Sequence, residues 1–296
     1  MGAAVAAAAF AFALPALSQS GHSNRTTGVL EGTILSVTAV RTDGKEDPIR
    51  VADLFLYENA VEQKIRNFSY DPSPARIILL VDNSQTVPAS VEELQQAIME
   101  FVYEIYDGDQ LFVIAYDEKP EIIQEWTDDP ETLKASLSTL RKQGNPHLFD
   151  ALNASVGEVL VPLMPGTRKT AIVVIGDGLD RGSKTPFDGM LNELMDKNVT
   201  VYALQLKDRT GGAYRRYSPK AGKVVSEITK KSGGVSFQFS EAKKAAKYIC
   251  DELRNNRYLL SYFPTNTSSY DARRLFVTAG EGIEIRLKAA QPPNIK

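Results

Sequence analysis

The chain has 296 residues, a net charge of -3, 43% hydrophobic residues and a single cysteine. This length allows one or two domains with buried cores, and the charge gives no support for nucleic-acid binding or for general attachment to membrane surfaces. The lone Cys250 excludes an intramolecular disulfide, and two histidines, His22 and His147, exclude a zinc site built from several histidines.

The first 25 residues have the pattern of an export signal. An apolar run at 3–14 is interrupted by Pro15 and followed by small residues. The run is too short for a comfortable membrane span, although no Lys or Arg precedes it. We expect export to the periplasm, the cell envelope or the medium. The alternative is an uncleaved N-terminal anchor, the only case in which we expect membrane contact.

Residues 26–72 and 256–296 have the character of β segments. Apolar residues alternate at 33–40 and 54–57, with a turn signal at 42–45 between them. Near the other end, strand-like runs at 258–263, 275–279 and 283–287 follow one another without a helix. Each segment is too small to be stable alone, so we expect the two to pair into one small β-domain.

Residues 75–255 alternate buried strands with amphipathic helices. Continuous apolar runs occupy 76–81, 170–175 and 200–206, a hairpin is expected at 110–126, and a short strand at 235–239. Helical spacing occurs at 91–106, 148–163, 187–197, 220–231 and 241–253. This order predicts an α/β fold with a doubly wound, mostly parallel sheet flanked by helices. Ligands of such sheets bind beyond the carboxyl ends of the strands.

Two of the buried strands run directly into segments rich in side-chain oxygens. Asp82, Ser84 and Thr86 follow the first strand, and Asp177 follows the second. Carboxyl ends of parallel strands meet at one edge of a sheet, so we expect these side chains to converge. Hard divalent cations prefer such oxygen ligands, and the pattern predicts a metal site. The alternative is that Asp82 and Ser84 only cap the following helix.

This pattern resembles the metal-ion-dependent adhesion site of von Willebrand factor type A domains. The segment 82–86 resembles the family's Asp-x-Ser-x-Ser signature, and 177–180 resembles its later acidic motif. Residues 144–152 resemble its middle segment, but Pro146 stands where the family has a metal-binding threonine. Asn145, His147 or a water are the candidate replacement ligands. A weakened or empty site is the alternative.

Flanking segments extend the resemblance to about 28–288. Residues 53–68 and 257–266 resemble the lead and trailing segments of a bacterial, acidobacterial-type subgroup of the family. The resemblance implies a Rossmann-like domain that binds Mg²⁺, with Mn²⁺ or Ca²⁺ as alternatives. It also implies a non-enzymatic binding protein whose partner protein completes the coordination shell with an Asp or Glu. It implies no partner identity and no oligomeric state.

The loop 207–220 leaves the same sheet edge and carries Arg209, Tyr214, Arg215 and Arg216. We predict that it helps to recognise the partner, with an ordinary solvated loop as the alternative. Two other functions compete with metal-dependent adhesion. One is a scaffold with a degenerate metal site that binds through its loops. The other is a hydrolase or phosphotransferase with Asp82 as nucleophile, which Ser84 disfavours because it stands where such an enzyme would need a second acid.

Overall fold

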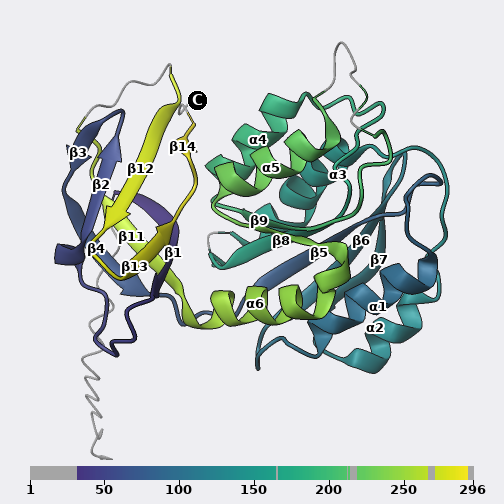
Figure 1. Ribbon diagram of the computed structural model, residues 1–296, viewed down its shortest axis with the longest axis horizontal. Helices are drawn as coiled ribbons and strands as arrows, with labels where there is room; N and C mark the ends of the chain where they lie inside the picture. Colours follow the sequence, from purple (N-terminus) through teal and green to yellow (C-terminus); the bar gives the residue numbers. More distant parts are fainter. Residues whose placement is uncertain (1–31, 165, 212, 214–218, 266–270, 293–296) are drawn as a thin grey trace, which may run out of the picture.

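The computed structural model describes residues 32–164, 166–211, 213, 219–265 and 271–292. An α/β unit and a smaller β-domain lie side by side (Figure 1). The predicted export signal and the residues Tyr214, Arg215 and Arg216 lie outside the described ranges. Within those ranges, no helix is both long enough and apolar enough to span a membrane.

The α/β unit is built on a six-stranded sheet. Its strands are β5 (Arg76–Asp82), β6 (Gln110–Tyr116), β7 (Pro120–Thr127), β8 (Thr170–Gly176), β9 (Thr200–Gln205) and β10 (Ser236–Gln238). They run in the spatial order β10-β9-β8-β5-β6-β7, parallel except for β7, which pairs with β6 as an antiparallel hairpin. The predicted mostly parallel sheet is confirmed. Its strand order reverses at β5, so the carboxyl ends of β5 and β8 flank the switch point where ligands of such sheets bind.

Helices cover both faces of this sheet (Figure 1). One face carries α1 (Val91–Val102), α2 (Pro130–Leu137) and α6 (Ala242–Asn255), and the other carries α3 (Leu148–Ala154), α4 (Phe187–Asp196) and α5 (Ala221–Ser232). Strand β5 shows why its sequence is continuously apolar. Leu79 packs into the first core and Leu80 into the second, so neither side of the strand meets water.

The helices differ from the prediction in three places. The helix expected at 91–106 ends at Val102. The helix expected at 148–163 is α-helical only to Ala154 and continues as a π-helical turn (Ser155–Leu160) and a 3₁₀ turn (Val161–Leu163). Pro162 lacks the N–H that a longer α-helix would need there. Helix α2 was not predicted, although its start is marked: the Asp129 side chain accepts a hydrogen bond from the Thr132 N–H at 2.8 Å, and Pro130 occupies the first turn.

The β-domain consists of two four-stranded antiparallel sheets. One has the order β13-β1-β11-β4, made of β13 (Ile283–Arg286), β1 (Thr33–Arg41), β11 (Arg257–Tyr262) and β4 (Ile65–Tyr70). The other has the order β14-β12-β2-β3, made of β14 (Ala290–Gln291), β12 (Arg273–Ala279), β2 (Leu54–Glu58) and β3 (Val61–Gln63). Side chains such as Leu35, Leu56 and Leu260 form a core of their own. Because β1 pairs with β11 and β2 with β12, the predicted small β-domain built from both end segments is confirmed.

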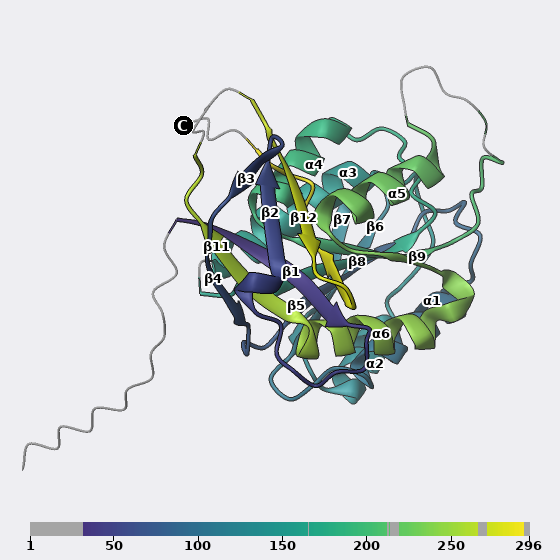
Figure 2. The same ribbon diagram turned by 60° about the vertical axis from the view of Figure 1, so that its left-hand side comes forward.

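The two parts pack against each other, and in the turned view of Figure 2 the β-domain lies in front of the α/β unit. Helix α6 leads directly into β11, and the Ala289 N–H donates to the Lys231 carbonyl of α5 at 2.8 Å. A buried polar cluster, here called the junction network, ties the parts together. Its members are Ser36, Thr38, Thr200, Tyr202, Glu252, Arg257 and Arg286.

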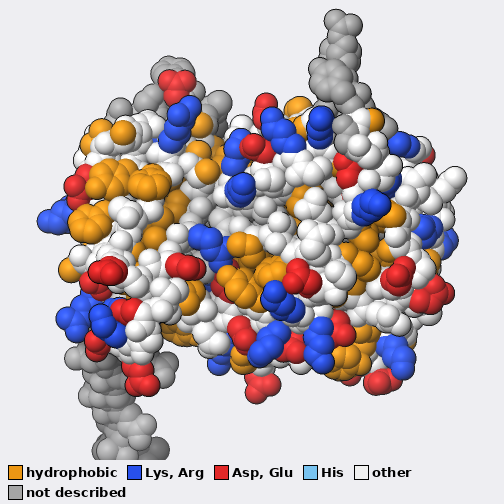
Figure 3. Space-filling model, viewed as in Figure 1, with side chains coloured by type: hydrophobic (Ala, Val, Ile, Leu, Met, Phe, Trp, Pro, Cys, Tyr) orange, Lys and Arg blue, Asp and Glu red, His pale blue; other side chains and the backbone are white. Residues whose placement is uncertain are grey.

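The face shown in Figure 3 carries both hydrophobic and charged side chains. Figure 3 shows hydrophobic side chains grouped on the β-domain, where Phe55 and Phe276 are among the exposed aromatic residues. On the same face of the α/β unit, Lys and Arg are interspersed with Asp and Glu. Mixed signs of this kind agree with the small net charge of -3.

Candidate functional site

The candidate site lies where β5 and β8 end. Asp82 is the last residue of β5, and Asp177 follows the last residue of β8; both side chains are fully buried. The loop after β5 turns around its own carboxylate. Asp82 Oδ1 accepts hydrogen bonds from the Ser84 N–H at 2.9 Å and from Ser84 Oγ at 2.5 Å. The second oxygen of Asp82 therefore remains for another partner.

That partner is Arg209, from the loop that follows β9. Its Nε donates to Asp177 Oδ2 at 2.8 Å, and its Nη2 donates to Asp177 Oδ1 at 2.9 Å and pairs with Asp82 Oδ2. Its Nη1 donates to Ser84 Oγ at 2.7 Å and to Thr86 Oγ1 at 3.0 Å. The Arg209 side chain is only 7% exposed. The structure thus brings the four predicted metal ligands together, around a guanidinium group.

One guanidinium shared by two carboxylates leaves this cluster short of positive charge. Burial raises the pKa of Asp82, even though the charge of Arg209 and the donors of Ser84 oppose the shift. Burial lowers the pKa of Arg209, but the hydrogen bond to Asp177 and the two carboxylate charges outweigh it and raise that pKa above its usual value. Arg209 is therefore firmly cationic, while Asp82 is not fully compensated for its loss of water.

The side chain of Tyr116 lies beside this cluster. Its side chain is fully buried, and burial together with the charges of Asp82 and Asp177 places its pKa well above the usual value, so the phenol is neutral. Among the described residues its hydroxyl has no hydrogen-bond partner. Gly176 makes room for this packing, because a Cβ there would lie 3.0 Å from Tyr116 Oη and 3.1 Å from Asp82 Cβ.

The segment that resembles the family's middle motif lies beside the Asp82 loop. The Gln85 N–H donates to the Gly144 carbonyl at 3.1 Å. Pro146 supplies no side-chain oxygen, and its carbonyl accepts a hydrogen bond from the Arg181 N–H at 2.7 Å. The two candidate replacement ligands make other contacts: Asn145 is exposed and reaches Glu118 at 3.5 Å, and His147 lies against Gly182.

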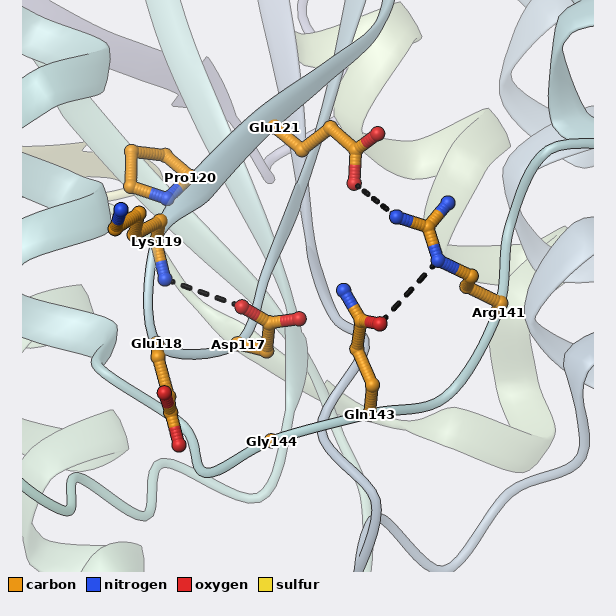
Figure 4. Close-up of a pocket in the computed structure, with 8 residues that line it drawn as sticks. All are labelled: Asp117, Glu118, Lys119, Pro120, Glu121, Arg141, Gln143 and Gly144. Carbon is orange, nitrogen blue, oxygen red and sulfur yellow. Dashed lines mark hydrogen bonds and ion pairs between the residues drawn. The ribbon is translucent and has the colours of Figure 1, made fainter.

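A polar pocket of about 520 Å³ lies on the same side of the sheet. It is lined by Asp117, Glu118, Lys119, Pro120, Glu121, Arg141, Gln143 and Gly144 (Figure 4). The turn between β6 and β7 forms one wall, and the segment 141–144 forms the other. The Arg141 side chain lies 3.5 Å from a Glu121 carboxylate oxygen and 3.3 Å from the Gln143 side-chain oxygen. We call this pocket and the Arg209 cluster together the rim.

These residues are of the types that bind a divalent metal, but their observed arrangement leaves no place for one. Carboxylate and hydroxyl oxygens are the ligands that Mg²⁺ takes. The guanidinium of Arg209 lies where these oxygens converge and uses the same lone pairs that a metal would need. The residues therefore do not accommodate a metal ion together with Arg209, and the expectation of Mg²⁺ remains a prediction.

The sequence analysis did not predict the direction of the Arg209 side chain. We expected it to face a partner from the loop 207–220, whereas its side chain turns inward to Asp82 and Asp177. A signal was present in the sequence. Strand β9 neighbours β8, so a basic residue shortly after β9 reaches the same sheet edge as Asp177.

Comparison with known proteins bears on the α/β unit. Residues 77–179 match the family model of the von Willebrand factor type A domain. The comparison with curated protein sequences finds no match.

Several solved structures are similar at low identity. An aerotolerance-related membrane protein from Bacteroides fragilis is 20% identical, with a TM-score of 0.47 over 61% of this chain and 98% of that one. A conserved hypothetical protein, BatB, from Bacteroides thetaiotaomicron is also 20% identical, with a TM-score of 0.43 over 61% and 97%. Proximal thread matrix protein 1 from the mussel byssus is 15% identical, with a TM-score of 0.49 over 63% and 49%. The matched residues 77–179 run from β5 to the turn that carries Asp177, so this first part of the α/β unit has the sequence pattern of a von Willebrand factor type A domain.

Proposed function

We propose that the chain is an exported, non-enzymatic protein-binding module whose binding face is the rim. The observation that carries the proposal is the position of the polar pocket and the Arg209 cluster, side by side at the carboxyl ends of β5, β6 and β8. Loops at this edge of a doubly wound sheet are where such folds place their ligands. The match of residues 77–179 to the von Willebrand factor type A domain supports a role in protein interaction.

The state of Asp82 supports a binding role over catalysis. A nucleophilic carboxylate needs an oxygen free to attack a substrate. Here Ser84 donates twice to one oxygen of Asp82, and Arg209 pairs with the other. His147, the one histidine within the described residues, lies against Gly182. A hydrolase working through Asp82 would have to dismantle these contacts first.

The exposed charges of the pocket are the part of the rim that a partner meets first. Glu118 and Glu121 are exposed, whereas the Arg209 side chain is almost fully buried. We therefore propose recognition through the loops, by charge complementarity with a protein surface that presents basic groups to Glu118 and Glu121. Completion of a metal shell by a partner's Asp or Glu is the competing proposal, and it requires Arg209 to leave the site.

Charge reversal at the pocket tests this function. The variant E118R/E121R reverses two exposed acids of the rim, and D107R/D128R reverses two exposed acids beside the opposite sheet edge. Both variants would be used as bait against the envelope fraction of the source organism. We expect the control to capture the same protein as the wild type and the rim variant to lose at least about tenfold of that capture.

A chelator arm separates the two forms of the proposal. Capture that survives EDTA supports recognition through the loops, and capture that EDTA abolishes supports metal-dependent binding. Equal capture by the wild type and E118R/E121R would refute the rim as the binding face.

A further inference from the structure

The position expected for a metal ion is taken by a side chain of the protein itself. We propose that the guanidinium of Arg209 is the resident cation of this von Willebrand factor type A site, and that the wild-type protein consequently holds no divalent metal there. The inference deepens the proposed function, because it concerns the cation of the same rim. Its test needs no partner protein, so the two can fail independently.

The first support is the full use of the Arg209 donors. A guanidinium has five N–H groups. The structure gives five side-chain hydrogen bonds from Arg209: two to Asp177, one each to Ser84 and Thr86, and one to Asp82. Each of the four predicted metal ligands is therefore engaged, and the guanidinium has no donor left over. A match this complete indicates a built position rather than an incidental contact.

The second support is the way the main chain holds Arg209 in place. The Leu206 N–H donates to the Gly176 carbonyl at 3.0 Å, so the loop after β9 stays beside β8. The Arg209 N–H then donates to Asp177 Oδ2 at 3.1 Å, the same oxygen that accepts from its Nε at 2.8 Å. Asp177 thus binds both the backbone and the side chain of Arg209. The guanidinium is directed into the site by local geometry as well as by charge.

The third support comes from a different segment. Pro146 stands where the family resemblance expects a threonine ligand, and its carbonyl is already bonded to the Arg181 N–H. Loss of one oxygen weakens a site for a hard ion, which needs several oxygen ligands. The five donors of Arg209 are satisfied without that oxygen. Pro146 in place of the threonine and Arg209 among the oxygen ligands both favour a guanidinium over a metal at this site.

Removal of Arg209 should restore the capacity for metal. Without the guanidinium, the buried carboxylates of Asp82 and Asp177 would face each other with the hydroxyls of Ser84 and Thr86 beside them. Two negative charges and four oxygen-bearing side chains at one point form a strong site for a divalent cation. In the wild type, a metal binds only to the small fraction of molecules in which Arg209 has left, which lowers the apparent affinity by that fraction.

Titration with Mn²⁺, followed by calorimetry and by the electron paramagnetic resonance of the free ion, tests the inference. We expect R209A to bind one Mn²⁺ at least about a hundredfold more tightly than the wild type, because the bonds of Arg209 no longer have to be broken. The double variant R209A/D82N should lose this binding. R273A is a matched control: the Arg273 side chain is also 7% exposed and pairs at 3.0 Å with the buried Glu58, but with a single acid. R273A should not gain Mn²⁺ binding.

Three results would overturn the inference. One is wild-type binding of Mn²⁺ with an affinity similar to that of R209A. Another is a folded R209A that binds no Mn²⁺. The third is a rise in the unfolding midpoint of the wild type on addition of Mn²⁺ that is absent in D82N. This measurement tests the inference even if R209A does not fold. The variant R209Q keeps much of the length of the side chain and removes its charge, so it serves as the second gain-of-binding variant.

Discussion

Two of the buried arginine–carboxylate clusters in the described part of the chain, the junction network and the rim, differ in charge. In the junction network, the one carboxylate of Glu252 pairs with Arg286, and Arg257 donates to Thr38 at 3.1 Å, whose hydroxyl in turn donates to Glu252 at 3.1 Å. At the rim, Asp82 and Asp177 share the single guanidinium of Arg209. The junction therefore has more cations than acids, and the rim has more acids than cations. A surplus of buried acid is what a site for exchangeable cations requires, whereas the junction is suited to holding the fold together.

The two clusters also differ in the chain segments that build them. The junction residues lie in regular elements: Thr38 in β1, Tyr202 in β9, Glu252 in α6, Arg257 in β11 and Arg286 in β13. At the rim, Asp82 ends β5, Pro120 and Glu121 begin β7, and the remaining groups come from loops. Loops tolerate changes of conformation that would disrupt a sheet. We therefore expect the fold to tolerate replacement of Arg209 at the rim better than loss of Glu252 at the junction.

The largest effect that would sharpen this comparison is expected at Glu252. In E252A, Arg286 loses its carboxylate, and the buried hydroxyls of Tyr202 and Thr38 lose their acceptor. Breaking a buried charge pair of this kind costs about 3–5 kcal/mol of unfolding free energy. Urea denaturation measures it, with the exposed Glu284→Ala as control, which should stay within about 0.5 kcal/mol of the wild type. A small loss in E252A would contradict the structural role of the junction.

A matched pair of tyrosines gives the next effect. Tyr202 of β9 and Tyr116 of β6 are both fully buried, but the Tyr202 hydroxyl donates to Glu252 at 2.5 Å and the Tyr116 hydroxyl has no partner among the described residues. Y202F should lose about 2–3 kcal/mol, because a bond to a buried charge is removed. Y116F should be unchanged or slightly more stable, because it removes an unpaired buried hydroxyl. Equal losses in thermal unfolding would show that Tyr116 has a partner.

A smaller, pH-dependent effect is expected at Lys288, a buried lysine outside the junction network whose Nζ donates to the Met195 carbonyl at 2.6 Å. Burial lowers its pKa to about 7, although the charge of Asp196 opposes the shift. Above pH 7 the unfolded chain keeps a proton that the folded chain has lost, so this group makes stability rise with pH until its unfolded pKa of 10.5 is reached.

The variant K288M removes this dependence. Between pH 7 and pH 9, the wild type should gain about 2 kcal/mol relative to K288M, as measured by urea denaturation at each pH. The comparison with the rim is direct: Arg209 stays charged beside two carboxylates, whereas Lys288 gives up its charge. Parallel pH profiles of the wild type and K288M would show that Lys288 remains charged in the folded protein.

The sequence predicted the fold more completely than it predicted the candidate site. Continuous apolar runs predicted β5, β8 and β9, because strands buried on both faces leave no polar positions. Helix α2 was not predicted because its buried face consists of only Leu133 and Leu137, which are too few to show a helical period. Strands as short as β3 and β14 carry no periodic pattern for the same reason.

At the site, sequence motifs predicted the oxygens and missed the cation. Asp82, Ser84, Thr86 and Asp177 each follow a recognisable strand, so the edge on which they meet could be inferred. The partner of these oxygens could not, because the direction of the Arg209 side chain depends on hydrogen bonds made after the sheet has formed. The oxygen ligands around the site could therefore be predicted from motifs, whereas the guanidinium of Arg209 that lies between them could not.

The pairing of β4 with β11 has a consequence for biogenesis. The chain enters the α/β unit after β4 and leaves it into β11, and these strands lie next to each other, with Tyr70 opposite Tyr258. Both sheets of the β-domain take two of their four strands from each end of the chain. During synthesis, the α/β unit therefore has all its strands before the β-domain can close. Strand β1, whose partners β11 and β13 both come late in the chain, must wait unpaired until the last part of the polypeptide is made, and β2 has only β3 beside it until β12 is made. A premature stop near residue 256 would leave a complete α/β unit attached to an open, aggregation-prone half of the β-domain.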